Sequence, residues 1–393
     1  MKHRRLRIAL ALGLLVVGCV GWRLTRDDQP NELPAVSAYA PAQKEARRAA
    51  QAGNDALTAS EAAALAALPP GTTLGPDRRE VRCQQDYLAQ VKALRARIDP
   101  DASPDSALAS ALLMRMTDFG DVQLRADSLR TLETATARWP DDVDLARHYF
   151  LECRGSRDCD ATAAMARLQR VDGHNMATWL EAMSLARQRD DDAGVHAALA
   201  RAAGAAGYDS SLGTAFIALR PALASLPLPA SCGEVLQSLA RDLGRTPTAG
   251  DYADLSAMAI EMAVALPGLG ALSVCREPDS EDTARDCRIV LRRLANADTL
   301  IERMYPLGLL IELEHDPAAA AALREQYRRT LWLAHAMAPE VPRIEGFLWR
   351  TWAEGEIPLL QRHAESIGRW PPPADWLPDN PDQRALITGD AQR

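Results

Sequence analysis

The sequence feature that most constrains the fold is a pair of amphipathic helices in residues 171–203, separated by a polar turn at 189–192. Side chains three and four residues apart share one face of an α-helix, whereas the side chains of a strand alternate between two faces. The pattern predicts a helical hairpin, which cannot bury its apolar face without a neighbour. The apolar residues at helical spacing on the two sides of the turn are Trp179, Ala182, Met183 and Ala186, then Val195, Leu199 and Ala202.

The composition favours helices along the whole chain. Hydrophobic residues make up 47% of the 393 residues and aromatic residues only 5%, so the apolar surface is mostly Ala and Leu. These two are good helix formers, while strands prefer β-branched and aromatic side chains. We expect an all-α protein, built either as two or three domains or as one extended array. The net charge of −8, with no basic tract beyond the first residues, argues against a nucleic-acid partner.

Residues 1–26 have the pattern of an export signal or membrane anchor. Four Lys and Arg residues within the first seven positions precede an uncharged run from 8 to 22, which is the order found in such signals. Two alternatives remain open. The run 16–19 is similar to a bacterial lipobox that would lipidate Cys19, or else the segment is an uncleaved anchor whose positive end stays in the cytoplasm. Either one tethers the chain to the membrane and places its bulk in the periplasm of the bacterial cell envelope, beyond a proline-spaced linker at 27–41.

Residues 104–208 contain three helical hairpins in tandem, and N-terminal helices are expected in 42–103. Leu132, Leu168 and Leu199 occupy similar contexts in the second helix of each hairpin, 36 and then 31 residues apart. A recurring unit of this length indicates an α-solenoid of antiparallel helical hairpins, in which stacked neighbours bury a continuous core.

The third hairpin resembles the tetratricopeptide repeat family in the positions of its large and small side chains. Trp179 and the small residues after it match the first helix of that repeat, and Val195, Leu199 and Ala202 match the second. The resemblance covers about a quarter of the chain. It implies a groove that is lined by the first helix of each hairpin and binds a protein or peptide. The matching groove residues are Arg147, Arg154, Ser184, Arg187 and Gln188.

The three arginines of this groove suggest a function and also have a plainer interpretation. Together they could clamp a carboxylate or a phosphate through paired hydrogen bonds. The alternative is that they are solvated arginines on helix faces, as expected in a chain with 25% charged residues.

Residues 209–370 continue as helices of less regular spacing, with prolines at most of the joints. Pro306 falls within one of them and is expected to kink or break it at Tyr305. Four tryptophans after position 345 suggest a cap over the end of the array, and 371–393 is expected to be a Pro-rich disordered tail. The helices are expected at 212–226, 233–243, 249–266, 283–295, 299–313 and 318–337.

Apart from Cys19 the chain has six cysteines, an even number that favours disulfides in an exported protein. Six cysteines permit 15 sets of pairs. Free buried thiols and a zinc site are the alternatives, although no close cysteine pair with a nearby histidine supports zinc. The expected pairs are Cys153 with Cys159 across the second hairpin, Cys275 with Cys287 between successive helices, and by elimination Cys83 with Cys232.

No other cluster of residues predicts catalysis, and we expect no metal and no cofactor. Glu312 and His315 have the Glu-x-x-His spacing of carboxylate-bridged metal sites, but those sites need two copies and this chain has one. The run 190–192 lacks the Gly and the last Glu of a calcium loop and is expected to be a solvated turn. The histidines at 148, 174, 196, 335 and 363 show no ligand spacing and are expected to be surface groups or satisfied core groups.

These features predict a membrane-tethered, non-catalytic scaffold of the cell envelope that binds a protein or peptide. The alternative is an envelope enzyme that acts on a polymer such as a glycan, with its site in the helices after 209. Acidic residues with raised pKa values in a deep cleft would favour the enzyme, and a groove without them would favour the scaffold.

Overall fold

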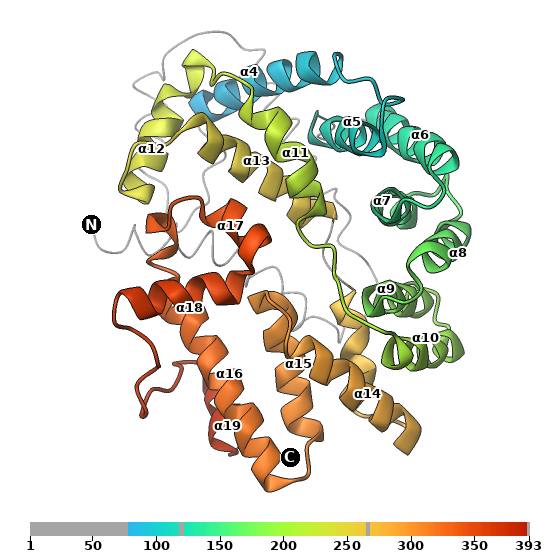
Figure 1. The fold of residues 1–393 in the computed structure, drawn as a ribbon, viewed down its shortest axis with the longest axis vertical. Coiled ribbons are helices and arrows are strands. Elements are labelled where there is room, and N and C mark those ends of the chain that lie inside the picture. The colour runs from blue at the N-terminus through green and yellow to red at the C-terminus, as the bar shows by residue number, and fades with distance from the viewer. Residues whose placement is uncertain (1–77, 118–121, 265–267, 391–393) are drawn as a thin grey trace, which may run out of the picture.

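A computed structural model describes residues 78–117, 122–264 and 268–390, which fold entirely into helices and connecting loops (Figure 1). This confirms the expected all-α class, because no strand forms within these ranges. The α-helices are α4 (Arg78–Arg95), α5 (Pro104–Thr117), α6 (Val122–Arg138), α7 (Val143–Arg154), α8 (Ala161–Asp172), α9 (Met176–Arg187), α10 (Asp192–Gly204), α11 (Thr214–Ala224), α12 (Gly233–Leu243), α13 (Ala249–Val264), α14 (Glu281–Leu294), α15 (Leu300–Leu313), α16 (Pro317–Met337), α17 (Phe347–Glu354), α18 (Glu356–Ser366) and α19 (Pro381–Thr388). The 3₁₀ helices are η2 (Ala230–Cys232), η3 (Leu269–Cys275) and η4 (Val341–Arg343).

Several sequence expectations lie outside the described residues. They are the signal or anchor at 1–26 with Cys19, the linker at 27–41, and the helices expected before α4. Among the helices of the described ranges, none is both long enough and apolar enough to span a bilayer.

Three antiparallel hairpins form where the sequence predicts them, as α5 with α6, α7 with α8, and α9 with α10. Helices α7, α8, α9 and α10 each begin at a capping residue. Its side chain accepts a hydrogen bond from a backbone N–H of the first turn that has no partner within the helix. The capping residues are Asp142, Asp160, Asn175 and Asp191. The acidic run at 190–192 therefore starts α10, with Asp190 in the left-handed region at φ 55°.

The helices after 209 fold back onto the three hairpins. In Figure 1, α5 to α10 follow one another along one side, while α11 to α13 and α14 to α19 fill the other. Helix α11 packs against α5 and α13, η3 packs against α9, and α14 packs against α10. The chain beyond 209 is thus in direct contact with the hairpins at both ends of the row.

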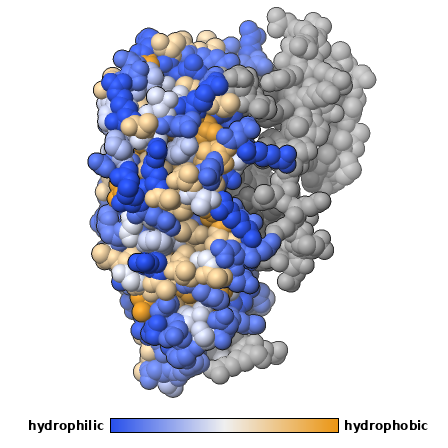
Figure 2. Space-filling model, turned by 90° about the vertical axis from the view of Figure 1, so that its right-hand side faces the viewer, coloured by the Kyte–Doolittle hydropathy of each residue, from blue (hydrophilic) through white to orange (hydrophobic). Residues whose placement is uncertain are grey.

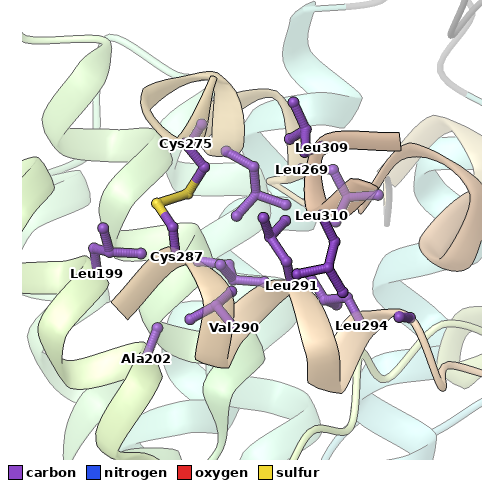
Figure 3. Close-up of a cluster of buried hydrophobic side chains, with 14 of the residues drawn as sticks. Leu199, Ala202, Leu269, Cys275, Cys287, Val290, Leu291, Leu294, Leu309 and Leu310 are labelled. Carbon is purple, nitrogen blue, oxygen red and sulfur yellow. A yellow bond between two sulfur atoms is a disulfide. The ribbon is translucent and has the colours of Figure 1, made fainter. Parts of the chain in front are cut away.

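Two hydrophobic clusters cross the expected boundary at 208/209. One joins α9 and α10 to η3, α14, α15 and α16, and Figure 3 shows Leu199 and Ala202 of α10 beside Val290 and Leu291 of α14. The other joins α4 and α5 to α11 and α13. Burial of apolar surface stabilises the protein in proportion to the area removed from water, so the two halves stabilise each other. The side of the molecule drawn in Figure 2 is mainly hydrophilic, with small scattered apolar areas.

The helix does not break at Pro306, because α15 continues through this residue to Leu313. Proline removes one backbone donor, which would have bonded the carbonyl of Glu302. Pro306, Leu307 and Leu310 are all buried, and packing of this face offsets the missing hydrogen bond.

The expected disorder of the tail is also wrong for residues 371–390, because Pro381–Thr388 forms α19 and packs against α16. Asn380 caps this helix and Pro381 occupies its first position, where proline is favoured. Leu386 and Ile387 pack against the large hydrophobic cluster. The ring centroid of Trp376 lies 5.1 Å from that of Trp332, in an edge-to-face contact.

The cysteines form the three expected disulfides. Cys83 pairs with Cys232, Cys153 with Cys159, and Cys275 with Cys287, at Cα–Cα distances of 4.6, 5.3 and 5.5 Å. The first joins α4 to η2, the second closes the α7–α8 turn, and the third joins η3 to α14 (Figure 3).

Replacing Cys83 and Cys232 together by alanine should lower the free energy of unfolding more than the same change at Cys153 and Cys159. The pairs are 149 and 6 residues apart in sequence, and a disulfide restricts the unfolded chain more when its loop is longer, by about 5 against about 2 kcal/mol in the chain-entropy model. Denaturant unfolding of the two double variants tests this. Equal losses would contradict the entropic explanation.

Candidate functional site

The inward faces of α7 and α9 are lined by polar and charged side chains that are almost fully buried. Charged residues are rarely buried unless they are paired, so this layer is the unusual part of the interior. Its members are Arg147, His148 and Glu152 on α7, Thr178 and Glu181 on α9, and Asp172 and Asn175 between α8 and α9.

Asp172 is the centre of this layer, because its Oδ2 accepts three hydrogen bonds. The donors are Arg147 Nη2 at 2.5 Å, Thr178 Oγ1 at 2.6 Å and Asn175 Nδ2 at 3.0 Å. Three donors at one oxygen fix the position of this buried side chain and satisfy its hydrogen-bonding capacity. Asn175 Nδ2 also donates to the Asp209 carbonyl, and the Asp209 N–H donates to Asn175 Oδ1. These two hydrogen bonds fix the 207–211 loop against the start of α9.

Two more ion pairs connect successive hairpins through the same layer. Arg115 of α5 pairs with Glu152 of α7 at 2.7 Å, and Arg154 of α7 pairs with Glu181 of α9 at 2.5 Å. Both carboxylates are less than a tenth exposed. Each pair therefore connects the first helices of neighbouring hairpins.

The structure places the five predicted groove residues in different surroundings. Arg147 and Arg154 lie in the buried pairs just described. Ser184 is partly buried beside Gly268, and the exposed Arg187 donates from Nη1 to the Gly270 carbonyl at 3.0 Å. Gln188 is exposed at the end of α9. All three arginines have partners within the chain, so they do not form an open anion clamp in this conformation.

Gly268 shows how closely the later chain approaches α9. A Cβ atom at this position would lie 2.9 Å from the Leu180 carbonyl oxygen and 3.1 Å from Ser184 Cβ. Real Cβ atoms essentially never come within 3.0 Å of another heavy atom, so glycine permits this close approach. Gly268 therefore covers part of the inward face of α9.

A small cavity lies in the polar layer, with a volume of about 10 Å³. His148 is buried beside it, and burial together with the charge of Arg147 lowers the pKa of its imidazole to about 4. His148 Nε2 and Arg147 Nε have no hydrogen-bond partner. The cavity is lined by Arg147, His148, Glu181, Tyr208, Ser210 and Ser211 on its polar side and by Leu151, Ala177, Leu180 and Gly268 on the other.

A second polar cluster lies where the 207–211 loop meets the starts of α15 and α18. Tyr208 Oη donates to Glu302 Oε1 at 2.6 Å, and Thr299 Oγ1 donates to Glu302 Oε2 at 2.5 Å. Burial and then Glu302 raise the pKa of Tyr208 well above its usual value. Glu356 accepts from the Leu300 N–H at 2.8 Å, and burial raises its pKa to about 7, with Glu302 adding to the shift.

The sequence analysis missed His148 and this second cluster. His148 directly follows Arg147 on the helix that was predicted to line the groove, and this position could have marked it as a candidate site residue. Thr299 and Glu302 have the Thr-x-x-Glu spacing of a capping box, which predicts the start of α15. Nothing in the sequence indicated Tyr208, because 94 residues separate it from Glu302.

The Glu-x-x-His sequence forms no metal site within the described ranges. Glu312 lies on α15, and His315 follows the end of that helix. No group of three or more His, Cys, Asp or Glu side chains in that part of the chain is arranged to hold a metal ion.

Comparisons with known protein families, curated proteins and solved structures give no match to this chain.

Replacing Asp172 by alanine should lower the free energy of unfolding by about 3 to 5 kcal/mol, because it leaves the Arg147 charge buried without its partner. The matched control is Asp141→Ala, which breaks the exposed pair with Arg170 and should cost less than about 1 kcal/mol. Denaturant unfolding measures both changes. Similar losses of unfolding free energy in the two variants would contradict the prediction that breaking the buried pair is more destabilising than breaking the exposed pair.

Stability should fall as the pH rises from about 5 to about 8. Burial raises the pKa of Glu261 from 4.5 to about 7, so between these values the folded protein holds a proton that the unfolded chain has released. Glu261 should lower the free energy of unfolding by up to about 3 kcal/mol across this range, and Glu356, whose pKa burial also raises to about 7, should add to the fall, which levels off above about pH 8. Thermal or denaturant unfolding across this range measures the slope.

The Glu261→Gln variant should lose about half of this pH dependence, because glutamine does not titrate, whereas Glu356, whose pKa is also raised to about 7, still does. Glu365→Gln, which changes an exposed residue on α18, is the control and should keep it. If the free energy of unfolding of Glu261→Gln depends on pH as strongly as that of the unchanged protein, Glu261 does not contribute to the pH dependence.

Proposed function

We propose that the protein is a membrane-tethered scaffold of the bacterial cell envelope that binds a polypeptide partner without catalysis. The binding surface lies at the end of α9, where Arg187 and Gln188 stay exposed beside the part of the inward face that the later chain covers. Residues 1–26 supply the tether in this proposal, either by lipidation of Cys19 or as an uncleaved anchor. The three disulfides support an extracytoplasmic location, since structural disulfides persist in oxidising compartments.

The observation that carries the proposed binding role is the exposed end of α9, where Arg187 and Gln188 remain accessible beside the buried polar layer. An exposed guanidinium next to an exposed amide can donate hydrogen bonds to the carbonyl or carboxylate oxygens of a polypeptide. In the tetratricopeptide arrays that the hairpins resemble, the corresponding face binds partners.

The carboxyl groups with raised pKa values do not favour the enzyme alternative. Glu261 is fully buried, and its Oε2 accepts from the Phe216 N–H at 3.0 Å near the start of α11. Glu356 bonds the start of α15 in the same way. Neither of them lines the cavity beside His148. Both act as acceptors for helix N-termini, which is a structural role.

Photocrosslinking in the native cell, with the tether intact, tests the proposal. A photoreactive residue at Gln188, which is exposed at the end of α9, should capture one reproducible polypeptide that mass spectrometry identifies. The same residue at Ala197, which is exposed on α10, is the control and should not capture it. The tether fused to an inert domain gives the background.

Two results would count against the scaffold. If no polypeptide exceeds the background at Gln188, the binding role is refuted. If capture is equal at Gln188 and Ala197, the partner does not recognise the end of α9.

A further inference from the structure

A groove with a volume of about 380 Å³ lies at the start of the hairpin row, where the end of α4 meets α5 and α6 (Figure 1). Pockets that bind small ligands have volumes of about 300 to 1,000 Å³. Two side chains that line this groove, those of Asp101 and Arg130, are each 65% exposed. A dissolved ligand can therefore enter the groove and reach its walls.

Four charged side chains line the groove, and one of them has no partner. Arg130 pairs with Asp127, and Asp101 pairs at 2.9 Å with Arg138, which lies outside the lining. Arg95, in the last turn of α4, forms no ion pair or side-chain hydrogen bond with any residue that the structure describes. The groove therefore has one positive charge that the chain does not balance.

The two carboxylates in the lining restrict the anion that fits. One negative charge balances Arg95, whereas a second would lie near Asp101 and Asp127 without a cation of its own, and like charges repel. A phosphate monoester carries about 1.5 to 2 negative charges at neutral pH. A carboxylate carries one, and its two oxygens match the planar guanidinium group in a bidentate pair. The charges of the groove therefore favour a carboxylate.

The apolar part of the lining indicates what carries this carboxylate. Met114 and Ala135 are buried and Pro100 is half-buried, so together they form an aliphatic floor below the exposed charged residues. A methionine side chain adapts to varied aliphatic shapes. We propose that this groove binds a carboxylate attached to an aliphatic chain, as found at the C-terminus or at an acidic side chain of a peptide. The site goes beyond the proposed function, because it shares no residue with the surface at the end of α9.

The groove is formed without the ligand, because its three helices are packed together beneath it. Ser128 of α6 is fully buried, and its Oγ donates to the Ala111 carbonyl of α5 at 3.1 Å. Leu94 of α4, Leu112 of α5 and Leu132 of α6 belong to one hydrophobic cluster. A site that is already ordered loses little conformational entropy on binding.

Three N-acetylated tetrapeptides test the site on the full-length protein. The first, Ala-Leu-Val-Ala, ends in a free carboxylate, the second ends in an amide, and the third keeps the amide but has glutamate in place of valine. The methyl signals of isotope-labelled methionines report binding, because Met114 lines the groove, while Met337 lies in another hydrophobic cluster and is the internal control. We expect Met114 to shift and Met337 to stay, with the first or the third peptide binding at least about tenfold more tightly than the second.

A charge-removing variant then locates the carboxylate at Arg95. Arg95→Gln should weaken binding of the carboxylate peptides by about tenfold, because glutamine keeps a donor but has no charge. Arg97→Gln changes an exposed arginine just after α4 that does not line the groove, and it should leave binding unchanged. A thermal melt confirms that each variant is folded, and the comparison of the three peptides on the unchanged protein needs no variant.

Every outcome bears on the site. Tighter binding of the first peptide than of the second assigns the carboxylate to a chain end, and tighter binding of the third assigns it to a side chain. Equal binding of all three peptides, or no shift of Met114 with any of them, would overturn the site. Full binding of the carboxylate peptides by folded Arg95→Gln would do the same. None of these measurements uses capture at Gln188, so the failure of this site and the failure of the scaffold can be told apart.

Discussion

The burial of charged side chains on α7 and α9 is the constraint on which the rest of the structure depends. A guanidinium or carboxylate removed from water needs a close partner of opposite charge and hydrogen bonds for its remaining atoms. Arg147 finds these at Asp172, and Arg154 finds them at Glu181. The first pair joins the two helices of the second hairpin, and the second pair connects that hairpin to the third.

The same layer explains why the chain folds back on itself. The row of hairpins alone would leave the inward face open to water. The 207–211 loop and Gly268 with η3 cover it, and the helices beyond extend the hydrophobic core that begins on α9 and α10. The Cys275–Cys287 disulfide lies in that shared core (Figure 3), so the covering segment is covalently joined to α14. The cavity beside His148 remains where this cover meets the hairpins.

The sequence predicted those parts of the fold that depend on local chemistry. Helical periodicity located the three hairpins, and the structure then shows that Asp142 and Asn175 cap two of their helices. The break at Pro306 and the disorder of the tail were not found, because local rules for proline do not include the packing that keeps α15 continuous and α19 attached. Apolar contacts to distant helices decided both cases.

The candidate site was only partly predictable. The resemblance to tetratricopeptide repeats selected Arg147 and Arg154, which do lie on the inward face. It could not show their partners, since the pairing of Arg154 with Glu181 depends on how two hairpins stack and spans 27 residues. The contact between Tyr208 and Glu302 depends on the return of the later chain, and no short pattern encodes it. The inward face of the hairpins was therefore predictable from the sequence, but the ion pairs and hydrogen bonds on that face were not.

The central claim is that the polar layer makes the hairpins and the covering helices one cooperative unit. Native-state hydrogen exchange at increasing denaturant measures this directly, because amides that open together share one free energy and one denaturant dependence. The account predicts that the amides of α7, α9, α14 and α15 merge into a single opening. Separate opening of α14 and α15, with α7 and α9 still protected, would contradict it.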